Sequence, residues 1–175
     1  MTRFINTLMF TTTFVLFNAC SLATPSSSCK IENSNVIGRV ENVLMQDIDL
    51  VLKARIDSGA GVSSIHAKIL EINTDPVTGF EFVTFQVAGE NEKPRTIRRK
   101  IVQWLDIKVK TTHKHERRPV VLLDFCLAGK KIEARVNLTD RSRFLYPLLI
   151  GRNILKTGDF LIDPRHKFMQ EAACR

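Results

Sequence analysis

The sequence lacks the short motifs that mark the commonest metal-dependent and nucleotide-dependent enzymes. It contains no His-Glu-x-x-His segment, so the zinc-carrying helix of many metalloproteases is not predicted. It contains no Gly-x-x-x-x-Gly-Lys-Ser/Thr segment either, which excludes the loop that holds ATP phosphates in many enzymes. No internal repeat is found, and no apolar run is long enough to cross a bilayer. No metal and no cofactor is therefore predicted.

Cysteine is also scarce, with four residues in a chain of 175. Cys29 and Cys174 lie near the two ends of the predicted folded part. A disulfide between them would tie the termini together in an oxidising compartment, and this pairing is a hypothesis. Cys126 lies within an apolar run at 120–127, so we expect it to be a small core residue.

Residues 1–23 have the pattern of an export signal. Arg3 precedes a mostly apolar run from Leu8 to Phe17, which is too short for a membrane span. Two cleavage sites remain open. Residues 17–20 form an imperfect lipobox that would leave Cys20 lipidated and anchored, and residues 21–23 offer an ordinary signal-peptidase site. Either product is expected in the periplasm or cell envelope.

The rest of the chain is predicted to be one globular domain. About 150 residues remain after the leader, which is enough for a single core. A composition of 44% hydrophobic and 25% charged residues is typical of globular proteins. The Ser-rich segment 24–35 is predicted to be a tether, 36–168 the domain and 169–175 a C-terminal tail.

Acidic residues are outnumbered by basic ones. The chain has 26 Lys and Arg against 18 Asp and Glu, and the leader removes only one Arg, which leaves a net charge of +7. This balance favours an anionic partner such as an acidic polypeptide or an envelope polymer, whereas nucleic acid is not predicted for an exported protein. The basic clusters 98–100 and 117–118 contain no aromatic residues, so we interpret them as solvated strand faces.

Apolar and polar residues alternate with a period of two along most of the domain, which predicts an all-β fold. One short helix is expected at 152–157, ended by Gly158, and a tight hairpin at 128–131. Strands are expected at residues 36–44, 50–56, 65–72, 80–88, 96–102, 107–111, 119–127, 131–138, 148–150 and 160–164.

The strand predicted at 50–56 ends in Asp57-Ser58-Gly59-Ala60, a turn that can present a catalytic carboxylate. Gly59 permits backbone angles closed to other residues and allows a second chain to approach closely. However, most Asp-Ser-Gly turns use the aspartate only to cap the turn. These four residues alone therefore do not decide between a structural and a catalytic role.

A second segment favours the catalytic role. Leu148-Leu149-Ile150-Gly151 is a short apolar strand that ends on glycine, directly before the predicted helix. Further matching motifs are Gly38-Arg39, Ser63–Ala67, Arg118–Val120, Asp140–Ser142, Tyr146-Pro147, Arg152 and Asp163-Pro164. Together with Ile56–Ala60, these motifs resemble the retropepsin-like aspartic proteases. The closer match is to the bacterial family historically named "ATP-dependent zinc protease", and it covers residues 36–168.

The resemblance implies a closed retropepsin-like (acid protease) barrel in which the 148–151 strand threads past the Asp57 loop and supports it. It also implies aspartic endopeptidase activity. Relatives in this family are associated with glutamate-ligase genes, which suggests a peptide or acidic polypeptide as the substrate. The words ATP and zinc in the family's name find no support in the residues of this chain.

Peptide hydrolysis by carboxylates needs two of them, one protonated and one charged to activate water. This chain has a single Asp-Ser-Gly-Ala and is too short for a second lobe, so the second Asp57 would come from another copy in a homodimer. The resemblance implies that the Ser58 hydroxyl bonds across the two-fold axis. The expected supporting residues are Gly59, Ala60, Ile150 and Gly151, with His66 and Arg152 as orienting residues.

Other candidate groups have simpler interpretations. His113 and His115 would point to one side of a strand, and His66 is a third imidazole, but basic neighbours favour exposed loop residues over metal ligands. Asp140 is interpreted as part of a local ion pair with Arg141 and Arg143, and Asp163 as a turn residue; either is a second acid if the protein works as a monomer. A cleft-covering flap is expected at 113–118 or at 89–95.

Two other functions stay open. One is a non-catalytic envelope module on the same fold that binds an anionic ligand with its basic surface. The other is a zinc-dependent hydrolase. A strict monomer in solution would favour the first, because it cannot form the shared carboxylate pair, and stoichiometric metal would favour the second.

Overall fold

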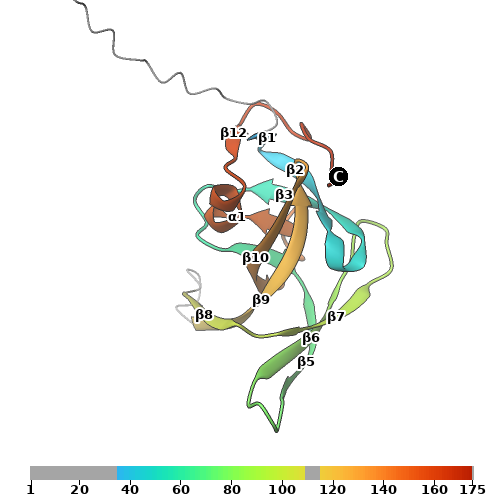
Figure 1. Cartoon of the computed structure of the whole chain (residues 1–175), viewed down its shortest axis with the longest axis vertical. Helices are drawn as coiled ribbons and strands as arrows, with labels where there is room; N and C mark the ends of the chain where they lie inside the picture. The colour runs from blue at the N-terminus through green and yellow to red at the C-terminus, as the bar shows by residue number, and fades with distance from the viewer. Residues whose placement is uncertain (1–34, 109–114, 175) are drawn as a thin grey trace, which may run out of the picture. The chain divides into compact units, whose positions relative to one another are not determined.

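The computed structural model describes residues 35–108 and 115–174 (Figure 1). Within these residues there is one α-helix, and no helix has the length and apolarity of a membrane span. The elements are β1 (Val36–Gly38), β2 (Val40–Met45), the 3-10 turn η2 (Gln46–Ile48), β3 (Leu50–Ile56), β4 (Ser63–His66), β5 (Lys68–Thr74), β6 (Glu81–Val87), β7 (Arg95–Lys100), β8 (Gln103–Lys108), β9 (His115–Leu127), β10 (Lys130–Thr139), β11 (Leu148–Ile150), α1 (Arg152–Thr157) and β12 (Leu161–Asp163).

Six strands close into a barrel in the order β10-β4-β11-β3-β2-β9, because β9 pairs again with β10. Strand β8 is added at the edge of β9. The pairs β10–β4 and β11–β3 are parallel, and the other neighbours in this sheet are antiparallel. The predicted all-β, closed retropepsin-like barrel with one short helix is confirmed.

The period-two pattern of the sequence explains the core. Along β3, Leu50, Leu52, Ala54 and Ile56 are buried, and the residues between them are exposed. Alternate side chains of a strand point to opposite faces, so one face of each strand fills the barrel. Burying a Leu, Ile or Phe side chain contributes about 1.5–3 kcal/mol each, and the shared core is what holds the short strands together.

A second sheet of three strands, in the order β5-β6-β7, extends below the barrel in Figure 1. Its inner face adds Val83, Phe85, Val87 and Ile97 to the common core. Strand β5 is exposed along its whole length. On the outer face of this sheet Arg98 lies 4.1 Å from the centre of the Phe82 ring. A basic side chain of the 98–100 cluster therefore stacks on an aromatic ring of the neighbouring strand.

The helix at 152–157 and the hairpin at 128–131 are confirmed. The hairpin turn uses Ala128 and Gly129, which both have positive φ angles of 51° and 76°. Two backbone residues in this region of φ match the right-handed twist of the flanking strands. Residues 88–94 join β6 to β7.

Four predicted strands are interrupted or displaced by more than two residues, and one of them is the strand expected at 119–127, which is β9 and starts at His115. The strand expected at 36–44 is interrupted at Arg39, whose N–H donates to the His166 carbonyl at 2.9 Å. The strand expected at 65–72 is divided at Ala67, whose N–H donates to the Thr139 carbonyl at 3.1 Å at the end of the β10–β4 pair, whereas β5 pairs with β6 in the second sheet. The strand expected at 107–111 is β8, which starts at Gln103; residues 109–111 lie outside the described part. In each case a tertiary partner sets the boundary.

The predicted disulfide is also wrong. Cys174 is bonded to Cys126, with their Cα atoms 5.6 Å apart, and not to Cys29, which lies outside the described residues. Cys126 is buried on β9 next to Leu44 of β2, so it is a core residue as expected. The sequence does not reveal that the chain end reaches β9.

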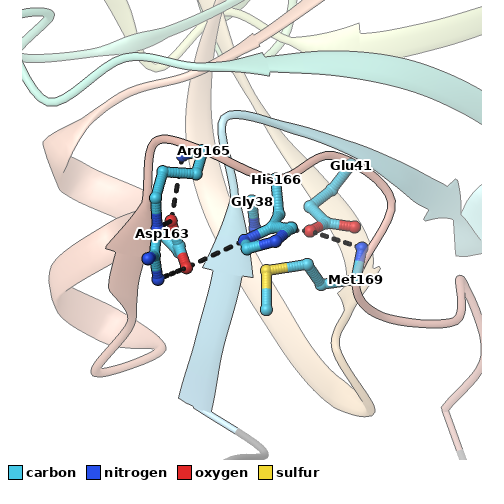
Figure 2. Close-up of polar contacts among 6 residues, drawn as sticks. All are labelled: Gly38, Glu41, Asp163, Arg165, His166 and Met169. Atoms are coloured by element: carbon cyan, nitrogen blue, oxygen red, sulfur yellow. Dashed lines mark hydrogen bonds and ion pairs between the residues drawn. The ribbon is translucent and has the colours of Figure 1, made fainter.

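Residues 163–174, here called the C-terminal strap, are attached to the barrel by a buried carboxylate (Figure 2). Glu41 is fully buried; its Oε1 accepts hydrogen bonds from the N–H groups of Gly38 and Met169, and its Oε2 accepts one from Gln170. An ionised or polar group in the interior is stabilised only when its hydrogen bonds are satisfied. The segment predicted as a tail is therefore fixed to the fold.

Candidate active site

Strand β3 ends at the buried Ile56 and delivers Asp57 into a tight turn. The Asp57 N–H donates to the Ile150 carbonyl at 2.9 Å, and the Ala60 N–H donates to the Asp57 carbonyl at 3.3 Å. The Gly59 N–H donates to Asp57 Oδ1 at 2.9 Å. The carboxylate therefore caps its own turn, as a structural aspartate would, and it remains half-buried beside the exposed residues Ser58 and Gly59.

Strand β11 lies between the two strands that flank this turn. It pairs in parallel with β3, with Ile150 opposite Ile56, and antiparallel with β4, with Leu149 opposite Ser64. The strand thus passes between the entrance and the exit of the Asp57 turn and bonds to both sides. Strand β11 comes about ninety residues later in the chain than this turn. Its insertion therefore couples the turn to the distant C-terminal part of the fold.

Gly151, at the end of β11, makes a close approach to the turn. A Cβ atom at this position would lie 2.9 Å from the Ala60 carbonyl oxygen and 3.0 Å from the Val62 carbonyl carbon. The next residue continues the contact, because the Arg152 N–H donates to the Ala60 carbonyl at 2.8 Å. Glycine is required here for space, since both neighbours are backbone atoms that cannot rotate away.

A buried hydroxyl completes this junction, and sequence reasoning did not single it out. Ser63 Oγ accepts a hydrogen bond from the Gly151 N–H at 2.9 Å and donates to Asn153 Oδ1 at 2.8 Å. The Asn153 side chain also accepts from the Ser63 N–H and donates to the Arg135 carbonyl. Ser63 belongs to one of the matching motifs, but its partner is ninety residues away, which only the fold reveals.

Arg152 holds the outer side of the turn. Its Nη1 donates to the Ser58 carbonyl at 3.0 Å and to the Gly59 carbonyl at 2.8 Å. Within residues 35–108 and 115–174, the Ser58 hydroxyl has no hydrogen-bond partner. The guanidinium thus fixes the backbone on either side of the Ser58–Gly59 peptide and leaves the Ser58 side chain exposed.

His66, the other predicted orienting residue, lies at the end of β4. The Arg141 N–H donates to His66 Nδ1 at 2.8 Å, and Asp140 Oδ1 is 3.4 Å from the same nitrogen. Because Nδ1 accepts a hydrogen bond from the Arg141 N–H, this nitrogen carries no hydrogen in this arrangement, and its contact with Asp140 is not an ion pair. His66 thereby positions the 140–141 segment.

Arg141 is the least exposed cation of the site. It is 7% exposed, its Nη1 donates to Ser64 Oγ at 2.8 Å, and its guanidinium lies 4.5 Å from the centre of the Phe144 ring. Burial lowers the pKa of Arg141, and the nearby charge of Arg118 lowers it further, whereas the Asp57 carboxylate opposes both effects. Its partner Ser64 lies opposite Leu149, the residue before Ile150, whose carbonyl accepts the Asp57 N–H, so Arg141 is bonded to the same group of strands that holds the Asp57 turn.

The local ion pair predicted between Asp140 and Arg141 is wrong, because Arg141 turns inward to Ser64. Asp140 instead accepts a hydrogen bond from the Ser142 N–H at 2.8 Å, and this bond is the largest cause that lowers the pKa of Asp140; the Arg143 charge contributes less. A carboxyl with a lowered pKa is a poor holder of a proton, so Asp140 does not fit the role of a second acid.

Asp163 does not fit that role either. It ends β12, as expected of a turn residue, and accepts hydrogen bonds from the Arg165 side chain at 2.9 and 3.1 Å (Figure 2). These bonds, together with the Arg165 N–H and His166, hold the pKa of Asp163 far below its usual range. Among the described residues, the hydrogen bonds of Asp140 and Asp163 come from residues close to them in the chain, and neither carboxylate bonds to Asp57.

The described residues contain no group of three or more His, Cys, Asp and Glu side chains that could hold a metal ion. Of the first segment in which a flap was expected, His113 and Lys114 lie outside the described part, and residues 115–118 begin β9. Strands β8 and β9 pair antiparallel, with Lys108 opposite His115. The other flap candidate, residues 89–95, joins β6 to β7 in the added sheet.

Comparison with known proteins places the chain among retropepsin-like proteins. A family model named RimB-like, with the description "Retropepsin-like aspartic endopeptidase RimB", matches residues 36–173. A crystal structure of Lpg0085, a Legionella pneumophila protein of unknown function, has 32% identity and a TM-score of 0.66. That match covers 78% of this chain and 98% of the other.

Curated relatives carry a different name. Two proteins named "Probable alpha-L-glutamate ligase", from Shewanella pealeana and Shewanella halifaxensis, are 31% and 30% identical over 143 residues. The match covers 78% of this chain but only 30% of each relative. The chain thus spans less than a third of the proteins to which the ligase name applies. None of these descriptions refers to zinc.

Proposed function

The chain belongs to the RimB-like family of retropepsin-like proteins, and on that premise we propose that it is an aspartic endopeptidase with Asp57 as its catalytic residue. One observation carries the proposal: β11 is inserted between β3 and β4 and bonds to both sides of the Asp57 turn. A catalytic carboxylate must be held rigidly, because a small displacement of the reacting group slows the reaction strongly. A turn that only connected two strands would not need this support.

The chemistry requires a second carboxylate, and we propose that a homodimer supplies it. Two aspartates a few ångströms apart cannot both ionise, so one acts as the acid while the other activates the attacking water. The lowered pKa values of Asp140 and Asp163 argue against a partner from the same chain. The exposed Ser58 hydroxyl has no partner in the described part of the chain, which suits a group that bonds to a second copy across a two-fold axis.

We propose an acidic peptide as the substrate. The net positive charge of the chain favours such a partner, and the matching segment of the curated relatives belongs to proteins named for joining glutamate. A hydrolase for the products of such a ligase would need to bind a chain of carboxylates. The leader pattern at residues 1–23 supports export, with Cys20 as the lipid anchor if the lipobox is used.

The proposal is tested by cleavage of an internally quenched hexaglutamate peptide and of denatured casein between pH 4 and 7. Asp57→Asn should abolish cleavage of whichever probe the wild type hydrolyses, because the amide can neither activate water nor share a proton. Asp106→Asn, an exposed change on β8, serves as the matched control and should retain activity. A wild type that cleaves neither probe would support the binding-module alternative, and a fully active Asp57→Asn variant would show that Asp57 is not the catalytic residue.

A further inference from the structure

We propose that Arg141 and Arg118 form a subsite near Asp57 that binds a carboxylate of the bound peptide. The inference rests on the proposed function, since it names the residues that would recognise an acidic substrate at that site. It assigns a binding role to two side chains that the catalytic proposal does not use.

The first observation is that Arg141 is a buried cation without an acidic partner. It is 7% exposed, and its side-chain bonds go to neutral acceptors, Ser64 Oγ at 2.8 Å and the Tyr146 carbonyl at 3.3 Å. Within the described ranges no carboxylate lies within 4 Å of its guanidinium. A buried charge is costly unless it is paired, so an unpaired one next to a catalytic turn indicates a partner that arrives from outside.

The second observation is a pair of unsatisfied atoms nearby. Arg118 Nε and Asn137 Oδ1 are buried and have no hydrogen-bond partner in the part of the chain that the structure describes. Arg118 Nη2 donates to Glu116 at 2.6 Å, and the guanidinium Nε is left without a hydrogen-bond partner. Buried polar atoms without partners are rare in native proteins and call for a missing ligand or water.

The sheet brings these groups to one face. Asn137 lies opposite Val120 in the β10–β9 pair and opposite Ser64 in the β10–β4 pair. Continuing the β10–β9 register by one step on this face places Arg118 beside Thr139, in agreement with the 3.5 Å contact between Thr139 and Glu116. Val136 and Leu138 point into the core, so Asn137 and Thr139 point to the opposite face, together with Ser64 and Arg118.

Of the two neighbouring acids, Glu116 occupies one nitrogen of Arg118, and Asp140 is engaged outside the proposed subsite. The Glu116 side chain is 44% exposed and bonded to Arg118, and the Asp140 side chain is 76% exposed and bonded to the Ser142 N–H. Neither bonds to Arg141. Guanidinium groups bind carboxylates through paired, charge-assisted hydrogen bonds, and the Phe144 ring fixes the plane of the Arg141 group for such a contact.

Peptide binding to the Asp57→Asn protein tests the subsite without requiring catalysis. Fluorescently labelled, C-terminally amidated hexaglutamate and hexaglutamine peptides, and a hexaglutamine peptide with a free C-terminal carboxylate, are titrated and followed by anisotropy. We expect at least one carboxylate-bearing peptide to bind about ten-fold or more tightly than amidated hexaglutamine. Tight binding of amidated hexaglutamate shows that a side-chain carboxylate is recognised, and tight binding of hexaglutamine with a free C-terminus shows that a terminal carboxylate is recognised.

Arg141→Met and Arg118→Met, each added to Asp57→Asn, should remove most of this preference and leave hexaglutamine binding unchanged. Arg98→Met, an exposed arginine stacked on a ring of the added sheet, is the matched control and should keep the preference. Circular dichroism verifies the fold; if Arg141→Met does not fold, Arg118→Met and Arg141→Lys provide the measurement. Equal binding of all three peptides, or a preference that survives both arginine changes, would overturn the subsite even if the wild type cleaves peptides in an Asp57-dependent manner.

Discussion

Gly151 lies directly against Ala60, so that a Cβ atom on Gly151 would meet the Ala60 carbonyl oxygen at 2.9 Å. This contact joins the strand that ends at Ile150 to the turn that begins at Asp57. The Asp57 N–H and the Arg152 N–H reinforce it from either side, through bonds to the Ile150 and Ala60 carbonyls. The position of the carboxylate therefore depends on a contact between segments far apart in the chain.

Gly151→Ala should destabilise the protein by about 1–3 kcal/mol, because the added methyl group has to displace backbone atoms. Gly61→Ala is a matched control in the same turn: its Cβ would meet only the Arg152 side chain, at an ordinary 3.6 Å. Urea denaturation of the two variants measures the difference. Equal stability of both variants would show that the close approach at Gly151 does not constrain the turn.

Arg152→Ala should lower kcat for peptide cleavage by about ten-fold or more while changing stability little, because the exposed guanidinium holds the Ser58 and Gly59 carbonyls and not the core. Lys156→Ala, an exposed change on the same helix, should leave kcat unchanged. Steady-state kinetics and thermal melts separate the two effects. A parallel loss of activity and stability would indicate a structural role alone.

The strand pattern, the helix at 152–157 and the hairpin at 128–131 could be predicted from the sequence because each depends on local signals. Alternation of apolar residues marks strands, and glycine marks turns that need unusual φ angles. The Asp57 turn and the 148–151 strand could be brought together only through a family resemblance. Nothing local to either segment states that β11 runs parallel to β3.

The remaining features depend on distant partners. The role of the Ser63 hydroxyl is recognisable only in the fold, where Gly151 and Asn153 lie next to it. In the sequence, Arg141 looks like the partner of Asp140 in a surface ion pair, whereas in the structure its side chain points inward to Ser64. Cys126 looks like an ordinary core residue because the strap that brings Cys174 to it contains no strand-like pattern. Contacts between residues far apart in the chain produce no recognisable pattern in a single sequence.

The disulfide should stabilise the fold by about 2–4 kcal/mol, because it closes a long loop in the unfolded chain. Cys126→Ser combined with Cys174→Ser should lower the urea midpoint accordingly, relative to the oxidised wild type. Peptide mapping of the non-reduced protein should yield one fragment pair that joins Cys126 and Cys174, which are 48 residues apart. A fragment that joins Cys29 to Cys174 would contradict the observed pairing.

The C-terminal strap should loosen in acid. The pKa of Asp163 is lowered in the folded state by the Arg165 and His166 side chains, so its contribution is complete above the usual Asp pKa of about 3.9 and is lost as the pH falls through the folded value. Wild type should be more stable than Asp163→Asn at pH 7, and the gap should narrow below about pH 4. Urea midpoints at several pH values provide the measurement, and a gap independent of pH would be the contrary result.

Mixing of subunits tests most directly whether two Asp57 carboxylates share one active site. Wild-type protein is equilibrated with increasing fractions of Asp57→Asn protein at constant total protein concentration, and the total cleavage rate is followed. If only dimers with two Asp57 residues are active, an equal mixture retains about one quarter of the activity expected from all-wild-type dimers at the same total concentration. Retention of about one half, in direct proportion to the wild-type fraction, would mean that each chain works alone and would contradict the shared pair.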